Sequence, residues 1–183
     1  MGFVLMLAGT GVYAQKGITV RSVEADDVDY SKYKTFNWAS HVSNDLDAGI
    51  YFLNDLILKA QVREAVKGEL MGLGYDEVEE NPDLLVNFRL FDQPVTLKGK
   101  EGYGENYWGT ADYNLPGETT YDVESGTLLL SLADRESGKV IWQGFASGLI
   151  DNNQFIKDEG KIREAVNLIF EDFNKRAKEY TRK

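Results

Sequence analysis

The feature that most constrains the fold of this chain is one continuous apolar stripe near its C-terminus. Six apolar residues recur there at helical spacing: Ile162, Ala165, Val166, Ile169, Phe170 and Phe173. Acidic residues at positions 158 and 159 precede the stripe and basic residues at 175, 176 and 178 follow it, which suits the dipole of a helix. An isolated amphipathic helix is marginal in water, so the rest of the chain must supply a surface for this apolar face.

A second helix is predicted between Tyr51 and Leu73. Its apolar residues fall mostly on one stripe: Leu53, Leu56, Ile57, Ala60, Val66, Leu70 and Leu73. Gly74 follows as the glycine expected just after a helix end. Glu79-Glu80-Asn81-Pro82 then interrupts the regular pattern.

The other patterned segments alternate with a period of two and predict strands. They cover residues 17–24, 34–38, 83–91, 119–133 and 140–147. Gly126 falls inside the fourth segment and predicts a bulge. Residues 134–138 predict a hairpin turn before the last strand.

The resulting order of elements is β-β-α-β-β-β-α. Hairpin-linked strands with only two helices argue against a doubly wound parallel sheet. We therefore expect an α+β fold in which a single, mainly antiparallel β-sheet carries two helices packed on one face. Residues 15–183 are expected to form this single domain, which is long enough to bury a full core without disulfides, and the chain contains no cysteine.

Residues 1–14 resemble a signal peptide. A short apolar run covers residues 3–9 and Val12-Tyr13-Ala14 follows with small outer residues, so cleavage after Ala14 is expected. The run is shorter than the roughly 20 apolar residues that span a bilayer, and no transmembrane segment is predicted. Because Met1-Gly2 supplies no basic residue, a start further upstream and a buried N-terminal strand stay open as alternatives. The expected location is periplasmic or otherwise extracytoplasmic, and without a cysteine at the cleavage point no lipid anchor is expected.

Charge and histidine content limit the chemistry. The net charge of −10 repels polyanions, so nucleic acid is not an expected partner. A serine nucleophile needs a base, and the single histidine, His41, lies in a polar loop. Gly102-Tyr103-Gly104 lacks the strand and helix that a dinucleotide-binding loop requires. No catalytic residue and no cofactor is therefore predicted.

Two acidic segments are candidates for a cation site. Residues 45–49 resemble the start of an EF-hand loop, but Leu56 stands where the closing glutamate is required. Asp26, Asp27 and Asp29 could form an irregular site, although turn chemistry explains them without a metal. No metal site is predicted.

The segment from Pro94 to Gly117 is the best candidate for function. It has no periodicity, and glycines interleave with four aromatic residues: Tyr103, Tyr107, Trp108 and Tyr113. Tyrosine and tryptophan are enriched at interfaces, and long irregular loops in compact domains are usually functional or disordered. Two interpretations stay open: the rings contact a partner, or they form a lid over the sheet face opposite the helices. Mixed side chains are expected on that face: Leu129, Ser131, Gln143 and Phe145.

Several short motifs together resemble a known family. They are Asp29-Tyr30-Ser31-Lys32-Tyr33-Lys34-Thr35-Phe36-Asn37-Trp38, Gly74-Tyr75, Asn81-Pro82-Asp83-Leu84-Leu85-Val86, Gly126-Thr127-Leu128, Gly138-Lys139-Val140-Ile141-Trp142-Gln143-Gly144 and the final helix. In order and spacing the chain resembles the bacterial envelope family catalogued as domain of unknown function 4136. The resemblance implies an exported protein and brings no established activity, substrate, cofactor or catalytic residue. Many members are lipoproteins, and this chain departs from them because it lacks the acylated cysteine.

The function expected from these observations is a non-enzymatic binding or interaction module of the envelope. It would use the aromatic loop and an open sheet face to bind an unknown envelope protein or ligand. The alternative is a hydrolase that acts on a periplasmic polymer through a carboxylate pair. The pairs easiest to name are Asp26 with Asp29 and Glu79 with Glu80.

Overall fold

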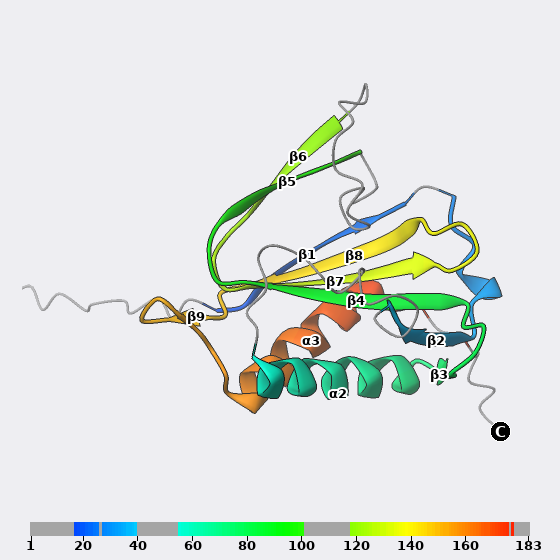
Figure 1. The fold of residues 1–183 in the computed structure, drawn as a ribbon, viewed down its shortest axis with the longest axis horizontal. Helices are drawn as coiled ribbons and strands as arrows, with labels where there is room; N and C mark the ends of the chain where they lie inside the picture. Colours follow the sequence, from blue (N-terminus) through cyan, green and yellow to red (C-terminus); the bar gives the residue numbers. More distant parts are fainter. Residues whose placement is uncertain (1–16, 26, 40–54, 101–117, 176, 178–183) are drawn as a thin grey trace, which may run out of the picture.

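The computed structural model describes residues 17–25, 27–39, 55–100, 118–175 and 177. These residues form a six-stranded sheet, two small two-stranded sheets and two α-helices (Figure 1). The elements follow in the order β1 (Thr19–Glu24), η1 (Tyr30–Lys32), β2 (Thr35–Trp38), α2 (Leu56–Gly72), β3 (Asp76–Glu77), β4 (Leu84–Phe91), β5 (Val95–Lys100), β6 (Glu118–Val123), β7 (Thr127–Asp134), β8 (Val140–Ser147), β9 (Ile150–Asp151), β10 (Gln154–Phe155) and α3 (Glu159–Phe173).

The large sheet has the strand order β1-β8-β7-β4-β2-β3. Its first four strands pair antiparallel, whereas β2 pairs parallel with both β4 and β3. The α+β class is confirmed, but the sheet is mixed, and the expectation of a mainly antiparallel sheet is wrong. The reason is the connection through α2: a helix between two strands returns the chain to the end of the sheet where the first strand began, so the next strand runs parallel.

Both helices lie on the same face of the large sheet (Figure 1). The main apolar core lies between them and the sheet, and the inward side chains of β4, β7 and β8 form its floor. Trp142 is the largest fully buried side chain, and its ring centroid lies 4.9 Å from that of Phe173. Two residues further along β8, a Cβ atom on Gly144 would lie 2.4 Å from Cη2 of Trp142 and 2.6 Å from Cγ2 of Ile169. Glycine at 144 therefore leaves the space that the side chains of Trp142 and Ile169 occupy.

The C-terminal helix matches its prediction. α3 buries the whole predicted stripe, which is Ile162, Ala165, Val166, Ile169, Phe170 and Phe173. Asp158 caps the helix, because its side chain accepts a hydrogen bond from the Lys161 N–H. Asn174 closes it in the left-handed conformation with φ of 36°.

The first helix differs from its prediction at its N-terminal end. α2 begins at Leu56, after Asp55, whose carboxylate accepts from the Ile57 and Leu58 N–H groups. Leu56 and Ile57, which the pattern placed on the buried stripe, are 78% and 73% exposed. Ala60, also on the predicted stripe, is exposed, and Leu53 lies outside the described residues. The predicted burial of Val66 and Leu70 is confirmed, and Leu58, Val62 and Ala65 are buried beside them. The predicted end is confirmed, because Gly74 has a φ of 91°, which glycine adopts without strain.

The predicted strand over residues 119–133 is two strands in different sheets. β6 ends at Val123 and β7 begins at Thr127, and Gly126 forms the turn between them rather than a bulge within one strand. Its φ is 72°, and a Cβ atom there would lie 2.7 Å from that of Ile150. Close packing and a left-handed backbone therefore both require glycine at this corner.

Candidate functional site

The β5–β6 hairpin is the most distinctive feature near the predicted functional segment. Residues 95–100, expected to be irregular, form β5 and pair antiparallel with β6 from Val95↔Val123 to Lys100↔Glu118. The two strands form their own sheet and rise away from the six-stranded sheet (Figure 1). The hairpin went unpredicted because residues 101–117 separate its strands and no short turn marks the pairing.

The base of this hairpin is anchored to the large sheet. Phe91, Val123, Leu129 and Phe145 form one buried cluster, against which Val23 and Val95 pack. Arg21 on β1 reinforces the anchor: its guanidinium lies 4.3 Å from the Phe145 ring centroid and its Nη2 donates to the Asp122 carbonyl at 3.1 Å. Thr96 also donates to the Asp122 carboxylate across the hairpin at 2.8 Å. The direction in which the hairpin leaves the sheet is thus set by side chains of β1, β7 and β8.

The predicted site residues Tyr103, Tyr107, Trp108 and Tyr113 lie outside the described residues. They belong to the segment that joins the paired ends of β5 and β6. His41 and the EF-hand-like segment at 45–49 also lie outside the described residues.

The four residues expected beneath the aromatic segment share one sheet face. Leu129 pairs with Phe145 and Ser131 with Gln143, and Gln143 Nε2 donates to Ser131 Oγ at 3.1 Å. Asn87 on β4 pairs with Ser131, so three polar side chains cross the middle of the face opposite the helices. None of the four predicted residues is more than 6% exposed. The sheet face is therefore not open at these positions, which corrects the expectation of an open binding face; Leu129 and Phe145 are buried because the hairpin base packs on them.

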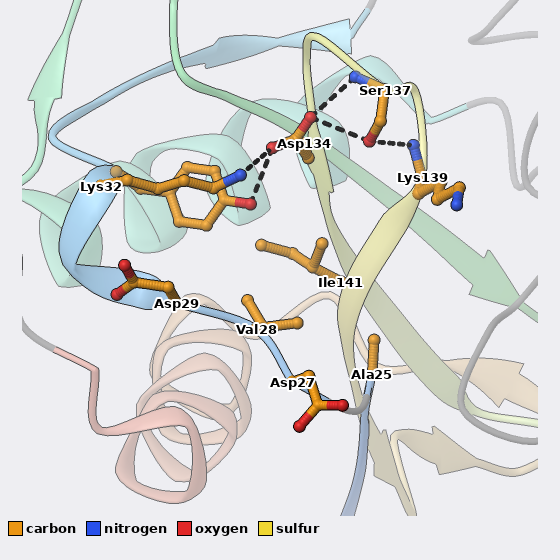
Figure 2. A pocket seen from close by; sticks show the side chains of 10 residues that line it. Ala25, Asp27, Val28, Asp29, Lys32, Asp134, Ser137, Lys139 and Ile141 are labelled. Carbon is orange, nitrogen blue, oxygen red and sulfur yellow. Dashed lines mark hydrogen bonds and ion pairs between the residues drawn. The ribbon is translucent and has the colours of Figure 1, made fainter.

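A cavity of about 240 Å³ lies at the opposite end of β7 and β8 (Figure 2). Asp134, which is 7% exposed, stands at its rim. One carboxylate oxygen accepts from Lys32 Nζ at 2.9 Å and from the Tyr33 hydroxyl at 2.8 Å. The other accepts from the Ser137 N–H at 2.7 Å and from its hydroxyl at 2.9 Å. Four donors therefore surround this carboxylate.

The electrostatics of this cluster hold Asp134 in its charged form. Burial raises the pKa of Asp134, but the hydrogen bonds from Lys32, Ser137 and Tyr33 together outweigh burial and hold that pKa well below its usual range. Burial, followed by the bond to Asp134, raises the pKa of Tyr33 to about 12. A general acid needs a pKa raised toward the working pH, so Asp134 is suited to anchoring rather than to proton transfer.

Sequence reasoning missed the Asp134 cluster, although a signal was present. Asp134 opens the predicted hairpin turn, a position where aspartate commonly accepts from N–H groups ahead of it. Its link to Lys32 and Tyr33 crosses about a hundred residues of sequence, with separations of 102 and 101. No local pattern indicates a contact of that range.

The acidic residues of the candidate cation and carboxylate sites that the structure describes lie in a 3-10 helix cap, a turn and a bend. Asp29 caps η1. The Asp29 carboxylate accepts hydrogen bonds from the Ser31 hydroxyl at 2.6 Å and from the Ser31 N–H at 3.0 Å, and these bonds lower the pKa of Asp29. Asp26 lies outside the described residues, while Glu79 and Glu80 are exposed in the bend after β3. Within the described residues, no three acidic or histidine side chains are placed to hold one metal ion.

Comparison with known proteins establishes the family. The chain belongs to the family described as Domain of unknown function (DUF4136), whose sequence profile matches residues 20–173. A solved DUF4136 family protein from Bacteroides thetaiotaomicron shares the fold, with a TM-score of 0.55 and 17% identity over 85% of this chain and 95% of that chain. No curated protein matches the chain in sequence.

Two further solved structures are similar at lower scores. A PDZ domain protein from Parabacteroides distasonis has a TM-score of 0.49 and 18% identity, over 91% of this chain and 37% of that chain. A PelC dodecamer from Paraburkholderia phytofirmans has a TM-score of 0.46 and 9% identity, over 87% of this chain and 100% of that chain.

In the described part of the chain, neither helix has the length and apolar character needed to cross a bilayer.

Proposed function

We propose that this protein is an exported, non-enzymatic binding module of the bacterial envelope, with its contact surface at the end of the β5–β6 hairpin. One observation carries the proposal. The hairpin is a separate two-stranded sheet that stands away from the large sheet, and Lys100 pairs with Glu118 at its far end (Figure 1). Both ends of the aromatic segment 101–117 are therefore held together at the end of an anchored arm.

The anchored base favours binding energetically. A partner that contacts a preorganised element loses less conformational entropy than one that must order a free loop. The cluster around Phe91 and Leu129, with Arg21 across it, supplies that preorganisation. In this proposal the sheet face is the support of the hairpin rather than an open contact surface.

The residues proposed to make contact are Tyr103, Tyr107, Trp108 and Tyr113. Their rings offer large contact area at a small loss of side-chain entropy. The partner is an envelope protein or ligand, and the location is extracytoplasmic, as the N-terminal apolar segment and the family resemblance suggest.

The alternative, a hydrolase with a carboxylate pair, requires one carboxyl group whose pKa is raised. The buried carboxylate of the described residues, Asp134, has a lowered pKa and four donors. No observation on the described residues favours hydrolysis over binding.

The test is a double substitution, Tyr107→Ala with Trp108→Ala, studied by capture from envelope extract and by thermal melting. Truncation of interface aromatics costs about 2 kcal/mol or more of binding, so capture should fall more than about tenfold. The melting temperature should stay nearly unchanged. A matched control is Leu56→Ala with Ile57→Ala, an exposed apolar pair on α2, which should leave capture intact.

The lid interpretation makes the opposite prediction. If the rings cover the sheet, the Tyr107/Trp108 double variant should lower the melting temperature by several degrees. Capture would then fall only in proportion to the unfolded fraction. That result would contradict the proposed contact surface.

A further inference from the structure

The strand β1 forms one long edge of the six-stranded sheet. Among the described residues it pairs with β8 alone, over six residues from Thr19 to Glu24. The opposite edge strand, β3, has only two residues (Figure 1). β1 contains no proline, and its pairing with β8 shows no bulge. Proline and bulges are two of the devices with which proteins block an edge, and the β1 backbone has neither. Its two charged side chains already have partners within the molecule: Arg21 contacts Phe145 and Asp122, and Glu24 forms an ion pair with Lys175.

The direction of the free backbone groups follows from one hydrogen bond. The Ala25 N–H donates to the Ile141 carbonyl at 2.9 Å, directly beyond the pair Glu24↔Trp142. In an antiparallel pair, hydrogen-bonded residues alternate with non-bonded ones, so odd-numbered residues of β1 face β8. The N–H and C=O groups of Val20, Ser22 and Glu24 therefore point away from the sheet.

A groove of about 390 Å³ runs beside this edge on the helix side of the sheet. Ile18, Val20 and Leu168 line it and are half-buried, while Glu171 and Asp172 of α3 line it and are exposed. Val20 pairs with the core residue Ala146, so it faces the helices. A strand added to β1 would place every second side chain in this groove.

The groove suits a long basic side chain. The methylene stem of lysine or arginine can pack on Leu168 and Val20 while its charged head reaches the carboxylates of Glu171 and Asp172. A second copy of this chain is a poor occupant of the β1 edge. Each copy carries a net charge of −10 and would bring its own acidic groove to the same edge.

We propose that the β1 edge binds an extended segment of a partner protein in which lysine or arginine occupies alternate positions. The partner backbone pairs with Val20, Ser22 and Glu24, and its basic side chains lie along the groove toward α3. This surface is separate from the hairpin end, and it stands whether or not the hairpin binds a partner.

The test uses the full chain and a fluorescent capped peptide, long enough to span β1, in which threonine and lysine alternate. Anisotropy should show saturable binding, and amide hydrogen exchange at Ser22 should slow about tenfold or more when the peptide is bound. A matched peptide of alternating threonine and glutamate has the same backbone and should not bind. Equal binding of the two peptides would overturn the proposal.

Two variants test separately how backbone pairing and the groove carboxylates contribute to binding. Ser22→Pro removes an outward N–H without removing a bond to β8 and should weaken binding up to about tenfold, whereas Ser22→Thr keeps the donor and should bind normally. Glu171→Gln with Asp172→Asn keeps the edge and should weaken binding severalfold while removing much of its salt dependence. Unchanged affinity in both the proline and the amide variants would overturn the proposal. Self-association of the peptide-free chain that Ser22→Pro abolishes would also overturn it, because a second copy would then be the occupant.

Discussion

The Tyr33 hydroxyl lies 2.8 Å from a carboxylate oxygen of Asp134 and donates a hydrogen bond to it. This contact joins the segment before β2 to the last residue of β7. Lys32 Nζ reaches the same oxygen at 2.9 Å, so two consecutive residues hold this end of the sheet together through one carboxylate.

Replacement of Asp134 by asparagine should destabilise the protein. The amide keeps the shape of the side chain but loses the charge that strengthens its bonds to Lys32 and Ser137. We expect a loss of about 2 kcal/mol in the free energy of unfolding, the usual range for hydrogen bonds to a charged group. Urea unfolding at neutral pH measures it, and a loss below about 0.5 kcal/mol would show that the cluster is not an anchor. Tyr33→Phe, which removes one of the four bonds, should lose about half as much.

Acid should remove the contribution of Asp134. Because its pKa in the folded protein lies below the ordinary value of 3.8, the contribution is complete above that value and declines as the pH falls toward the folded pKa. Asp83 acts in the same window, since the Lys34 and Thr35 N–H groups outweigh its burial and lower its pKa. Unfolding free energies measured from about pH 5 down to pH 2 should therefore fall less steeply in Asp134→Asn than in wild type. Parallel curves would contradict this reading.

Truncation of Phe170 tests the packing of α3 on the sheet. Its side chain is 3% exposed and lies edge-on to Phe173, with their ring centroids 6.0 Å apart. Phe170→Ala should cost about 3–5 kcal/mol in chemical denaturation, the usual range for a buried aromatic residue. The neighbouring exposed residue provides the control: Glu171→Ala should change stability by no more than about 0.5 kcal/mol. A loss below about 1 kcal/mol for Phe170→Ala would contradict the helix-on-sheet packing.

Two glycine-to-alanine substitutions should change the stability of the protein in opposite directions. Gly144→Ala forces its methyl group against Trp142 and Ile169, and overpacking of this kind costs about 1–3 kcal/mol. Gly68 lies inside α2 with no atom within 4 Å of an added Cβ, so Gly68→Ala should stabilise by about 0.5–1 kcal/mol through helix propensity. Thermal melting of both variants checks the pair. Equal effects would contradict the close contact at Gly144.

Export is tested by the N-terminus of the protein from its native host. If residues 1–14 are a signal peptide, mass spectrometry should find Gln15, or its cyclised pyroglutamate form, as the first residue. Recovery of a chain that still begins at Met1 would refute cleavage after Ala14.

Elements with a strong local period were predicted well. All six predicted core residues of α3 are buried, and β1, β2, β4 and β8 lie within a residue or two of their predicted bounds. The apolar spacing of α2 is less regular, and it wrongly predicted that Leu56 and Ile57 are buried. The start of a helix depends on its cap, here Asp55, as much as on apolar spacing.

The candidate site was predicted only in part. Leu129, Ser131, Gln143 and Phe145 do share a face, because alternation along two paired strands determines it. The burial of Leu129 and Phe145 was not predictable, since it depends on the hairpin base. That base packs Val123 and Val95 onto the sheet from strands that no local pattern paired.

By itself, the sequence determined which residues of α3 and of the central strands face the core, and where Gly74 and the turn at 134–138 reverse the chain. Those properties depend on local spacing and backbone preference, which a few consecutive residues express. Only the tertiary structure decided that β2 pairs parallel with β4, that β6 leaves the main sheet, and that Asp134 meets Lys32. These contacts join residues far apart in the chain, and their free energy arises from pairing and burial across the whole sheet rather than from any local segment.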